Sequence, residues 1–210
     1  MEEWQRFEVP EVLQEKTEED RIYALREELK KMEREIERLK HDSLTGLARR
    51  PDAEDAKEIK ERRKRSNKPW TTLMLDIDRF KTINDRYGHP IGDDVIAATA
   101  DALRHFSRAN DVVMRWGGEE FVVLFNNATP QDIIDKFYNK NDKKAEISFE
   151  LTIDDQKIPV TLSGGVASFE KEDGLEEAVG RADAALLWAK THGRNQIANY
   201  DVLPPEEEKN

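Results

Sequence analysis

Two adjacent glutamates stand at the start of an apolar segment, directly behind two glycines. Gly117 and Gly118 precede Glu119 and Glu120, and the apolar run 121–125 follows at once. Because glycine has no side chain, the backbone amides of this turn can approach a ligand such as a phosphate group closely. Side chains alternate along a strand, so only one carboxylate is expected to face a shared site unless the turn distorts the pair. Taken alone, the pattern is typical of a hairpin turn with solvated acids.

A second acidic pair, Asp76 and Asp78, changes that interpretation. These residues flank Ile77 at the end of the segment 70–78, which has the character of a strand. Hard oxygen ligands from two neighbouring strands suit Mg²⁺, which keeps water and substrate phosphates in its remaining positions. A partly buried cluster of acids without a cation would be costly. The two acidic pairs together therefore favour a divalent-cation site.

Nucleotide recognition is predicted for residues 80–94, interpreted as a loop rich in glycine and proline that opens a helix. Asn84, His89 and Asp93 are polar residues spread through this segment. A carboxylate can accept hydrogen bonds from both N1–H and N2–H of guanine, whereas adenine offers no such edge. The segment thus favours guanine over adenine.

Three basic side chains are candidates for holding a triphosphate. Lys190 and Arg194 are four residues apart and are expected on one face of a helix, and Lys81 follows the Asp-x-Asp pair. Alternatively, these three side chains are ordinary surface charges.

The elements that must position these residues lie between positions 42 and 203. Gly117 and Gly118 are expected to supply positive φ in a two-residue turn between two strands. Strands that come in hairpins, with helices between them, predict an α+β sandwich on a largely antiparallel sheet. Strands are expected at 70–78, 111–116, 119–125, 145–153 and 157–169, and helices at 91–107, 129–138 and 175–190.

Residues 17–41 predict a separate helix with an apolar seam. Thr17 and Asp20 form a plausible N-terminal capping pair. Apolar residues recur at alternating spacings of three and four, as in a heptad repeat. This favours a parallel coiled-coil dimer over an amphipathic helix packed on its own domain. The seam consists of Ile22, Leu25, Leu29, Met32, Ile36 and Leu39.

Composition narrows the class of protein. The 210 residues include 45 acidic and 34 basic side chains, for a net charge of −11, which argues against a binder of nucleic-acid polymers. The absence of cysteine excludes a thiolate metal site, and no apolar run is long enough for a membrane span. We expect a cytoplasmic protein with a coiled-coil segment at 1–41, a catalytic domain at 42–203 and a disordered tail at 204–210.

Five ordered motifs resemble those of the bacterial GGDEF-domain diguanylate cyclases, over about residues 42–200. The resemblance implies a fold like the palm of nucleotide cyclases and polymerases, which agrees with the α+β prediction. The motifs are DSLTGL (42–47), DIDRFKTINDRYGHPIGDDVI (76–96), GGEEF (117–121), SGGVASF (163–169) and RADAALLWAKTHGRN (181–195).

The resemblance implies a reaction between two GTP molecules held by two facing domains. The 3′-hydroxyl of one GTP attacks the α-phosphate of the other, pyrophosphate leaves, and two such steps make cyclic di-GMP. By resemblance, Asp76, the Ile77 carbonyl and Glu119 bind Mg²⁺, with Mn²⁺ as the alternative ion, and Glu120 supports a second ion. Glu119 is also expected to assist deprotonation of the 3′-hydroxyl, either directly or through the ion.

The remaining implied roles concern the substrate and the product. Asn84 and Asp93 match the family's guanine-reading positions, and His89 matches a nearby position that contacts the substrate. Gly117 and Gly118 match the turn over which the nucleotide passes. Lys81, Lys190 and Arg194 match the family's phosphate-binding positions. Backbone groups around Arg79 and Phe80 are implied to contribute to phosphate binding as well.

Arg108 and Asp111, in the segment RAND, match the family's RxxD site, where bound product inhibits the enzyme. Arginine can bond guanine O6 and N7 together, and aspartate can accept from N1–H and N2–H. As a bare pattern, RxxD usually marks a surface ion pair, but its offset from GGEEF favours a product site here. The segment 126–146 also lacks the arginine that often completes this site from a second domain.

Two alternatives to an active cyclase remain. The first is a catalytically silent GGDEF module that binds GTP or cyclic di-GMP and signals through its coiled coil, and intact motifs argue against it. The second is a cyclase of altered base choice that makes a hybrid dinucleotide. Asp93 argues against this one, because its carboxylate would repel the lone pair on adenine N1.

Overall fold

The computed structural model describes residues 18–139, 144–153 and 156–204. The chain forms two compact units, residues 1–40 and 41–210. Thr17 of the expected capping pair and most of the expected disordered tail lie outside the described residues. No described helix is both long enough and apolar enough to cross a membrane.

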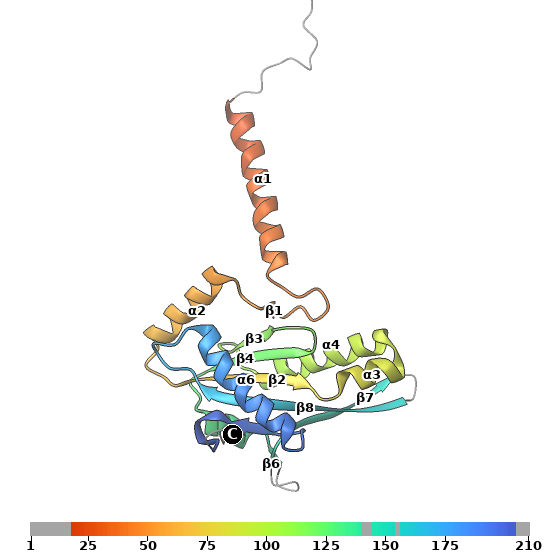
Figure 1. Ribbon diagram of the computed structural model, residues 1–210. Coiled ribbons are helices and arrows are strands. Elements are labelled where there is room, and N and C mark those ends of the chain that lie inside the picture. The colour runs from red at the N-terminus through yellow and green to blue at the C-terminus, as the bar shows by residue number, and fades with distance from the viewer. Residues whose placement is uncertain (1–17, 140–143, 154–155, 205–210) are drawn as a thin grey trace, which may run out of the picture. The chain divides into compact units, whose positions relative to one another are not determined.

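The first unit contains the helix α1 (Glu18–Leu39), shown in Figure 1. Its first turn carries three acidic residues and its last turn Arg38, an arrangement that complements the helix dipole. The helix itself was therefore predicted correctly. The six seam residues are all between 43% and 65% exposed in this chain.

The second unit is built on a mainly antiparallel sheet, as predicted. Its strand order is β1-β3-β4-β2-β8-β7, with β9 also paired to β8. Two pairs are parallel, β1 with β3 and β8 with β9. The strands are β1 (Ala48–Arg49), β2 (Trp70–Ile77), β3 (Val112–Arg115), β4 (Glu120–Asn126), β7 (Ile147–Ile153), β8 (Gln156–Ser168) and β9 (Ile197–Asn199), and a separate ribbon pairs β5 (Tyr138–Asn139) with β6 (Lys144–Ala145).

The helices agree with the expected ones except near residue 80. A loop was expected at residues 80–94, but the chain is helical there. Phe80 and Ile83 give the first of the two helices a buried face. Gly88, with φ of 87°, ends that helix and caps the next, so the chain reverses at a residue that tolerates this conformation. The helices are α2 (Ala53–Arg65), α3 (Phe80–Tyr87), α4 (His89–Phe106), α5 (Pro130–Lys136), α6 (Leu175–Thr191) and the 3₁₀ turn η2 (Tyr200–Val202).

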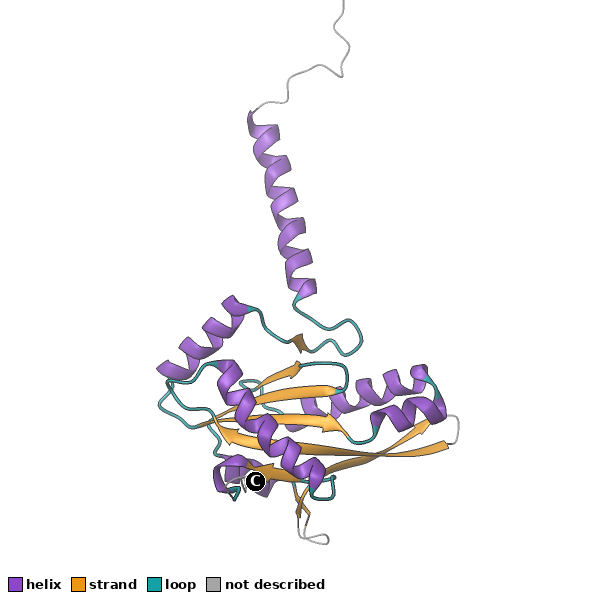
Figure 2. Cartoon of the chain, in the orientation of Figure 1, coloured by secondary structure: helices purple, strands orange, loops and turns teal. Residues whose placement is uncertain are grey.

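Strand β2 is buried along its whole length because helices cover both faces of the sheet (Figure 2). Leu73 and Leu75 belong to one apolar cluster, together with Val95 of α4. Met74 belongs to the other, together with Leu186 of α6. Helix α6 packs on the backbone of β8, and a Cβ at Gly165 would lie 2.0 Å from the Ala182 carbonyl oxygen.

The turn between β3 and β4 differs from the expected one. It spans residues 116–119, and the N–H groups of Trp116 and Gly117 both donate to the Glu120 carbonyl. Among the described glycines, positive φ occurs only at Gly46, Gly88 and Gly193, so the prediction of positive φ at Gly117 and Gly118 was wrong. Because β4 begins at Glu120, Glu119 lies in the turn and is free of strand alternation.

Candidate active site

The site begins at the end of β2 with Asp76. This residue is 8% exposed, and its Oδ2 accepts a hydrogen bond from Lys190 Nζ at 2.8 Å. In the sheet register it stands opposite Glu120 of β4 and Ser163 of β8. A fully buried central strand thus delivers one carboxylate to the face that α6 covers.

Glu119 and Glu120 both lie close to this carboxylate. The Glu119 carbonyl accepts from the N–H of Ile77 at 3.3 Å, which ties the turn to the end of β2. Glu120 is directly opposite Asp76, so the two side chains share one face of the sheet. The Glu120 carboxylate folds over the turn, and a Cβ at Gly117 would lie 2.7 Å from its Oε2. The turn therefore places both glutamates beside Asp76, which simple alternation did not predict.

Burial perturbs the two central carboxyls, and the charge of Asp76 also acts on Glu119. Burial raises the pKa of Asp76, and the hydrogen bond and charge of Lys190 oppose this only in part. Burial, followed by the negative charge of Asp76, raises the pKa of Glu119. A buried carboxyl and a partly buried one beside it, each with a raised pKa, are an arrangement that a divalent cation relieves.

The donor set fits Mg²⁺ or Mn²⁺. Among the residues that the structure describes, no group of three or more His, Cys, Asp or Glu side chains is arranged to enclose a metal ion. Mg²⁺ is usually held by one or two carboxylates together with substrate phosphates, rather than by an all-protein cage. Asp76, Glu119 and the Ile77 carbonyl provide that kind of incomplete set.

Asp78 is directed elsewhere, which corrects the expectation that the two aspartates share one cation. Its carboxylate accepts from Thr161 Oγ1 at 2.8 Å, Ser163 Oγ at 2.6 Å and the Asn195 N–H at 2.9 Å. Thr161 and Ser163 belong to β8, which pairs with β2, so these donors direct the Asp78 carboxylate toward β8. Asp76 is paired instead with Lys190 of α6.

The predicted guanine-reading residues lie on two consecutive helices. Asn84 is on α3, and His89 and Asp93 are exposed near the start of α4. The helices approach closely, and a Cβ at Gly92 would lie 1.9 Å from Asn84 Oδ1. That oxygen is buried and has no hydrogen-bond partner in the described chain. An unpartnered buried acceptor is costly, and a base with N–H donors would satisfy it.

The phosphate-binding candidates gather near the same end of the sheet. Phe80 and Lys81 open α3, whose N-cap residue makes no side-chain capping bond, so the amides of these two residues can face an anion. Helix α6 ends at Thr191, so Arg194 is not on the helical face predicted for it. Arg194 instead lies in the following turn, and its charge still lowers the pKa of Asp76, although less than Lys190 does.

One buried ion pair was missed by the sequence interpretation. Arg115 Nη1 is 2.9 Å from Asp42 Oδ1, and both side chains are less than 20% exposed. The same guanidinium donates to the Gly118 carbonyl at 2.7 and 3.1 Å. Asp42 also accepts from the N–H and hydroxyl of Thr45. The motif DSLTGL thereby holds the glycine turn, and the only signal for this in the sequence was an arginine two residues before Gly117.

Arg108 and Asp111 line a different cavity of about 540 Å³, together with Asp132 and Lys136 of α5. Asp111 accepts from the Arg108 N–H at 2.7 Å and from the Asn126 N–H at 3.0 Å. Burial lowers the pKa of Lys136, and nearby Asp111 opposes this. The two residues from α5 had no signal in the sequence, because the RxxD pattern covers one short segment only.

Comparison with known proteins identifies the family. The sequence profile described as "Diguanylate cyclase, GGDEF domain" matches residues 39–196. Diguanylate cyclase DgcM of Escherichia coli K12 is 36% identical over 81% of this chain and 41% of its own length. Diguanylate cyclase A of Treponema denticola is 39% identical over 60% of this chain and 33% of its own length. The chain thus spans well under half the length of these curated relatives.

A solved structure has a similar fold. The coiled coil and GGDEF domain of DgcB from Caulobacter crescentus, determined in complex with c-di-GMP, gives a TM-score of 0.70 at 25% identity. The match covers 86% of this chain and 98% of that one.

The ion pair of Asp42 with Arg115 predicts a pH-dependent stability. Burial alone would raise the pKa of Asp42, but bonds from Thr45 and Arg115 outweigh it and hold the pKa below its usual range. A carboxyl with a lowered folded-state pKa stabilises the fold above its unfolded pKa, and this stabilisation is lost as pH falls through the folded value. Asp42→Asn should lower the free energy of unfolding at pH 7 by about 1–3 kcal/mol.

Denaturant unfolding at several pH values measures this effect. The difference between the two proteins should begin to shrink below about pH 4, near the unfolded pKa, and should vanish only below the lowered folded-state pKa of Asp42. Glu150→Gln is the matched control, since its pair with Lys157 is exposed and should contribute less than about 1 kcal/mol. Two results would contradict this role of the Asp42–Arg115 pair. One is a loss of unfolding free energy in Asp42→Asn no larger than in Glu150→Gln, and the other is a loss that does not depend on pH.

Proposed function

This chain belongs to the GGDEF family of diguanylate cyclases, and we propose that it condenses two GTP molecules into cyclic di-GMP and two pyrophosphates. The observation that carries the proposal is the pair Asp76 and Glu119, a buried and a partly buried carboxyl that each have a raised pKa, beside Lys190. This combination suits a reaction in which charge develops on phosphoryl oxygens.

Asp76, Glu119 and the Ile77 carbonyl would hold a divalent ion, with Glu120 at its edge. When bound, Mg²⁺ or Mn²⁺ supplies positive charge that stabilises the phosphoryl oxygens during transfer. Lys190 and Arg194 bind the phosphate tail, and Lys81 with the first-turn amides of α3 binds its far end. These contacts align the α-phosphate for attack.

Glu119 is the proposed proton acceptor. The 3′-oxygen of one nucleotide forms a bond to the α-phosphorus of the other, and the bond from that phosphorus to pyrophosphate breaks. The hydroxyl proton passes to Glu119 and then to solvent. A carboxylate with a raised pKa is a stronger base than an ordinary one, so the environment of Glu119 favours this role.

Guanine is read by Asn84 and Asp93. The unpartnered Asn84 oxygen accepts from an N–H donor on the base edge, and the Asp93 carboxylate accepts from N1–H and N2–H. Adenine lacks N1–H and N2–H and presents the lone pair of N1, so the Asp93 carboxylate would be left unsatisfied. Loss of such bonds discriminates strongly between bases, so we propose GTP as the substrate.

Glu119→Gln should abolish product formation. The change removes a metal ligand and the base while preserving shape, and loss of one ligand corresponds to roughly a thousandfold or more in rate. Incubation with GTP and Mg²⁺, followed by chromatography, measures cyclic di-GMP and pyrophosphate. Glu172→Gln is the matched control, because Glu172 is exposed and distant from Asp76 in the sequence.

Near-normal turnover by Glu119→Gln would refute the assignment of Glu119. If the dimeric chain without substitutions binds a GTP analogue but forms no cyclic di-GMP from GTP, it is the catalytically silent GGDEF module instead.

Two domains must meet, because each site as proposed holds one nucleotide. The exposed seam of α1 supports a parallel coiled-coil dimer, which would raise the effective concentration of the domains, to about millimolar for a short tether. Leu29→Asp with Ile36→Asp places charges in the seam. We expect this variant to be monomeric by light scattering, with specific activity that rises steeply with protein concentration.

Lys30→Gln with Lys31→Gln is the matched control. It makes the same total change in charge on the outer face of α1 and should stay dimeric. A monomeric seam variant whose activity is high and independent of concentration would show that the helix does not organise catalysis.

Arg108 and Asp111 are proposed to bind the product and to inhibit the enzyme. Asp111 is held by backbone N–H donors, including that of Arg108 itself. Arg108→Ala should therefore preserve the local turn and remove only the guanidinium. Calorimetry should show cyclic di-GMP affinity weakened by about ten- to hundredfold, with initial turnover retained. Lys57→Ala is the control, because Lys57 is an exposed cation on α2. If Arg108→Ala still binds cyclic di-GMP tightly, the segment RAND forms a surface ion pair only.

A further inference from the structure

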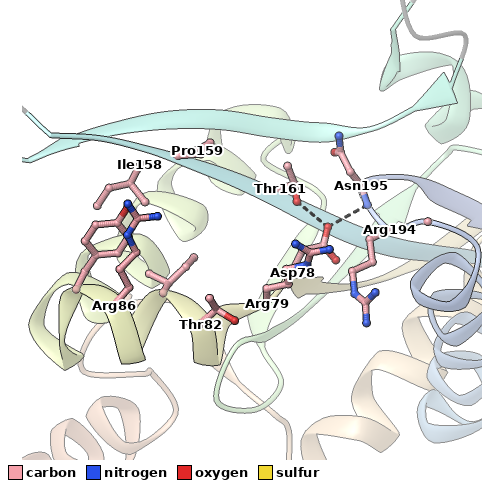
Figure 3. Close-up of a pocket in the computed structure, with 12 residues that line it drawn as sticks. Asp78, Arg79, Thr82, Arg86, Ile158, Pro159, Thr161, Arg194 and Asn195 are labelled. Atoms are coloured by element: carbon pink, nitrogen blue, oxygen red, sulfur yellow. Dashed lines mark hydrogen bonds between the residues drawn. The ribbon is translucent and has the colours of Figure 1, made fainter.

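Asp78 is a buried acid that the proposed chemistry does not use. It is 8% exposed, and its two carboxylate oxygens accept three hydrogen bonds of 2.6–2.9 Å. Figure 3 shows Thr161 and Asn195 bonded to it from different segments. Its own N–H donates to the Thr161 carbonyl at 2.9 Å. The side chain is therefore held in place, with both oxygens occupied.

The three donors come from two segments far apart in sequence. Thr161 and Ser163 are on β8, next to the central strand, and Asn195 follows α6. Two of the contacts join side chains within the sheet, and the third reaches the backbone of the turn 193–195. Asp78 thus fastens this turn to the end of β2.

That turn is costly to form. Gly193, Arg194 and Asn195 all have positive φ, at 110°, 60° and 43°. L-residues with side chains adopt this conformation rarely, and Asn195 tolerates it better than Arg194. It persists only where the surroundings fix it. The supports are Asp78, the Ala189 carbonyl, which accepts from the Arg194 N–H at 3.0 Å, and Glu146, which accepts from Asn195 Nδ2 at 3.1 Å.

Arg194 is the residue that this turn displays. Its side chain lines a cavity of about 390 Å³ whose wall also includes Asp78 and Arg79 (Figure 3). Among the described residues, no carboxylate lies within ion-pair distance of its guanidinium, whereas Lys190 is paired with Asp76. Arg194 is thus available to an anion, in an orientation set by the turn.

We propose that Asp78 is a positioning residue that fixes the turn 193–195 and so directs Arg194 at the phosphate tail of the nucleotide. The proposal rests on the proposed function only in taking a nucleoside triphosphate as the ligand. It assigns the second aspartate of the Asp-x-Asp pair a role distinct from that of a metal ligand.

Affinity for a non-hydrolysable GTP analogue, measured by calorimetry, tests the proposal. Asp78→Ala should weaken binding of the analogue by about ten- to hundredfold, as expected for loss of a charged contact to phosphate. Affinity for guanosine, which has no phosphate, should change less than threefold. Asp78→Asn should retain most of the affinity, because the amide oxygen still accepts from Asn195 and the hydroxyls can reorient toward the amide.

A double-mutant cycle separates positioning from general structural support. If Asp78 acts through Arg194, Asp78→Ala should add almost no further loss in an Arg194→Ala background. An equal loss in both backgrounds, or no loss in either, overturns the proposal. A metal ligand would instead make Asp78→Asn as damaging as Asp78→Ala, with the loss seen only when Mg²⁺ is present.

Ser163→Ala provides a milder variant should Asp78→Ala not fold. It removes one support of the Asp78 carboxylate and should weaken analogue binding severalfold, again only while Arg194 is present; full affinity would count against the proposal. Because every readout is binding, the test does not depend on turnover. A chain that binds the analogue through Asp78 and Arg194 but makes no cyclic di-GMP would refute the proposed function and leave this inference standing.

Discussion

The burial of negative charge at the end of strand β2 is the constraint on which the rest of the site depends. This strand is buried along its whole length, yet it ends in Asp76 and is followed by Asp78, each 8% exposed. Buried carboxylates need partners, and several elements provide them. Helix α6 brings Lys190 to Asp76, while β8 and the turn after α6 bring donors to Asp78. Neighbouring Glu119 adds negative charge instead of relieving it, and the proposed metal ion and phosphates would complete the balance at this position.

The same constraint explains why the glycine turn is held so firmly. Glu119 approaches Asp76 only because the turn 116–119 leaves it outside the strand. Arg115 fixes that turn from outside by bonding the Gly118 carbonyl, and Asp42 fixes Arg115. Asp42 belongs to the first motif of the catalytic unit and lies just after the helix α1. A chain of contacts therefore runs from the start of this unit to the turn that carries Glu119.

Much of this could be predicted from the sequence, for identifiable reasons. The sequence predicted the strands 70–78 and 157–169 and the helix 175–190, because burial against the core selects apolar residues in these segments. The pattern did not show that residues 80–87 are helical, since glycine and proline nearby suggested a loop. Spacing placed Arg194 on a helix that in fact ends at Thr191, and placed the two aspartates in one site. In each case the outcome depends on where an element ends, which tertiary contacts decide. The Asp42–Arg115 pair joins residues 73 positions apart, which no local pattern reveals.

Anomalous diffraction from crystals grown with Mn²⁺ and a non-hydrolysable GTP analogue tests the central claim most directly. The account predicts a manganese peak about 2.0–2.3 Å from a carboxylate oxygen of Asp76, from one of Glu119 and from the Ile77 carbonyl. It also predicts that the analogue's phosphates complete the coordination, and that Asp78 keeps its three hydrogen bonds and does not contact the ion. A peak coordinated by Asp78, or an analogue bound with no metal at Asp76, would contradict it.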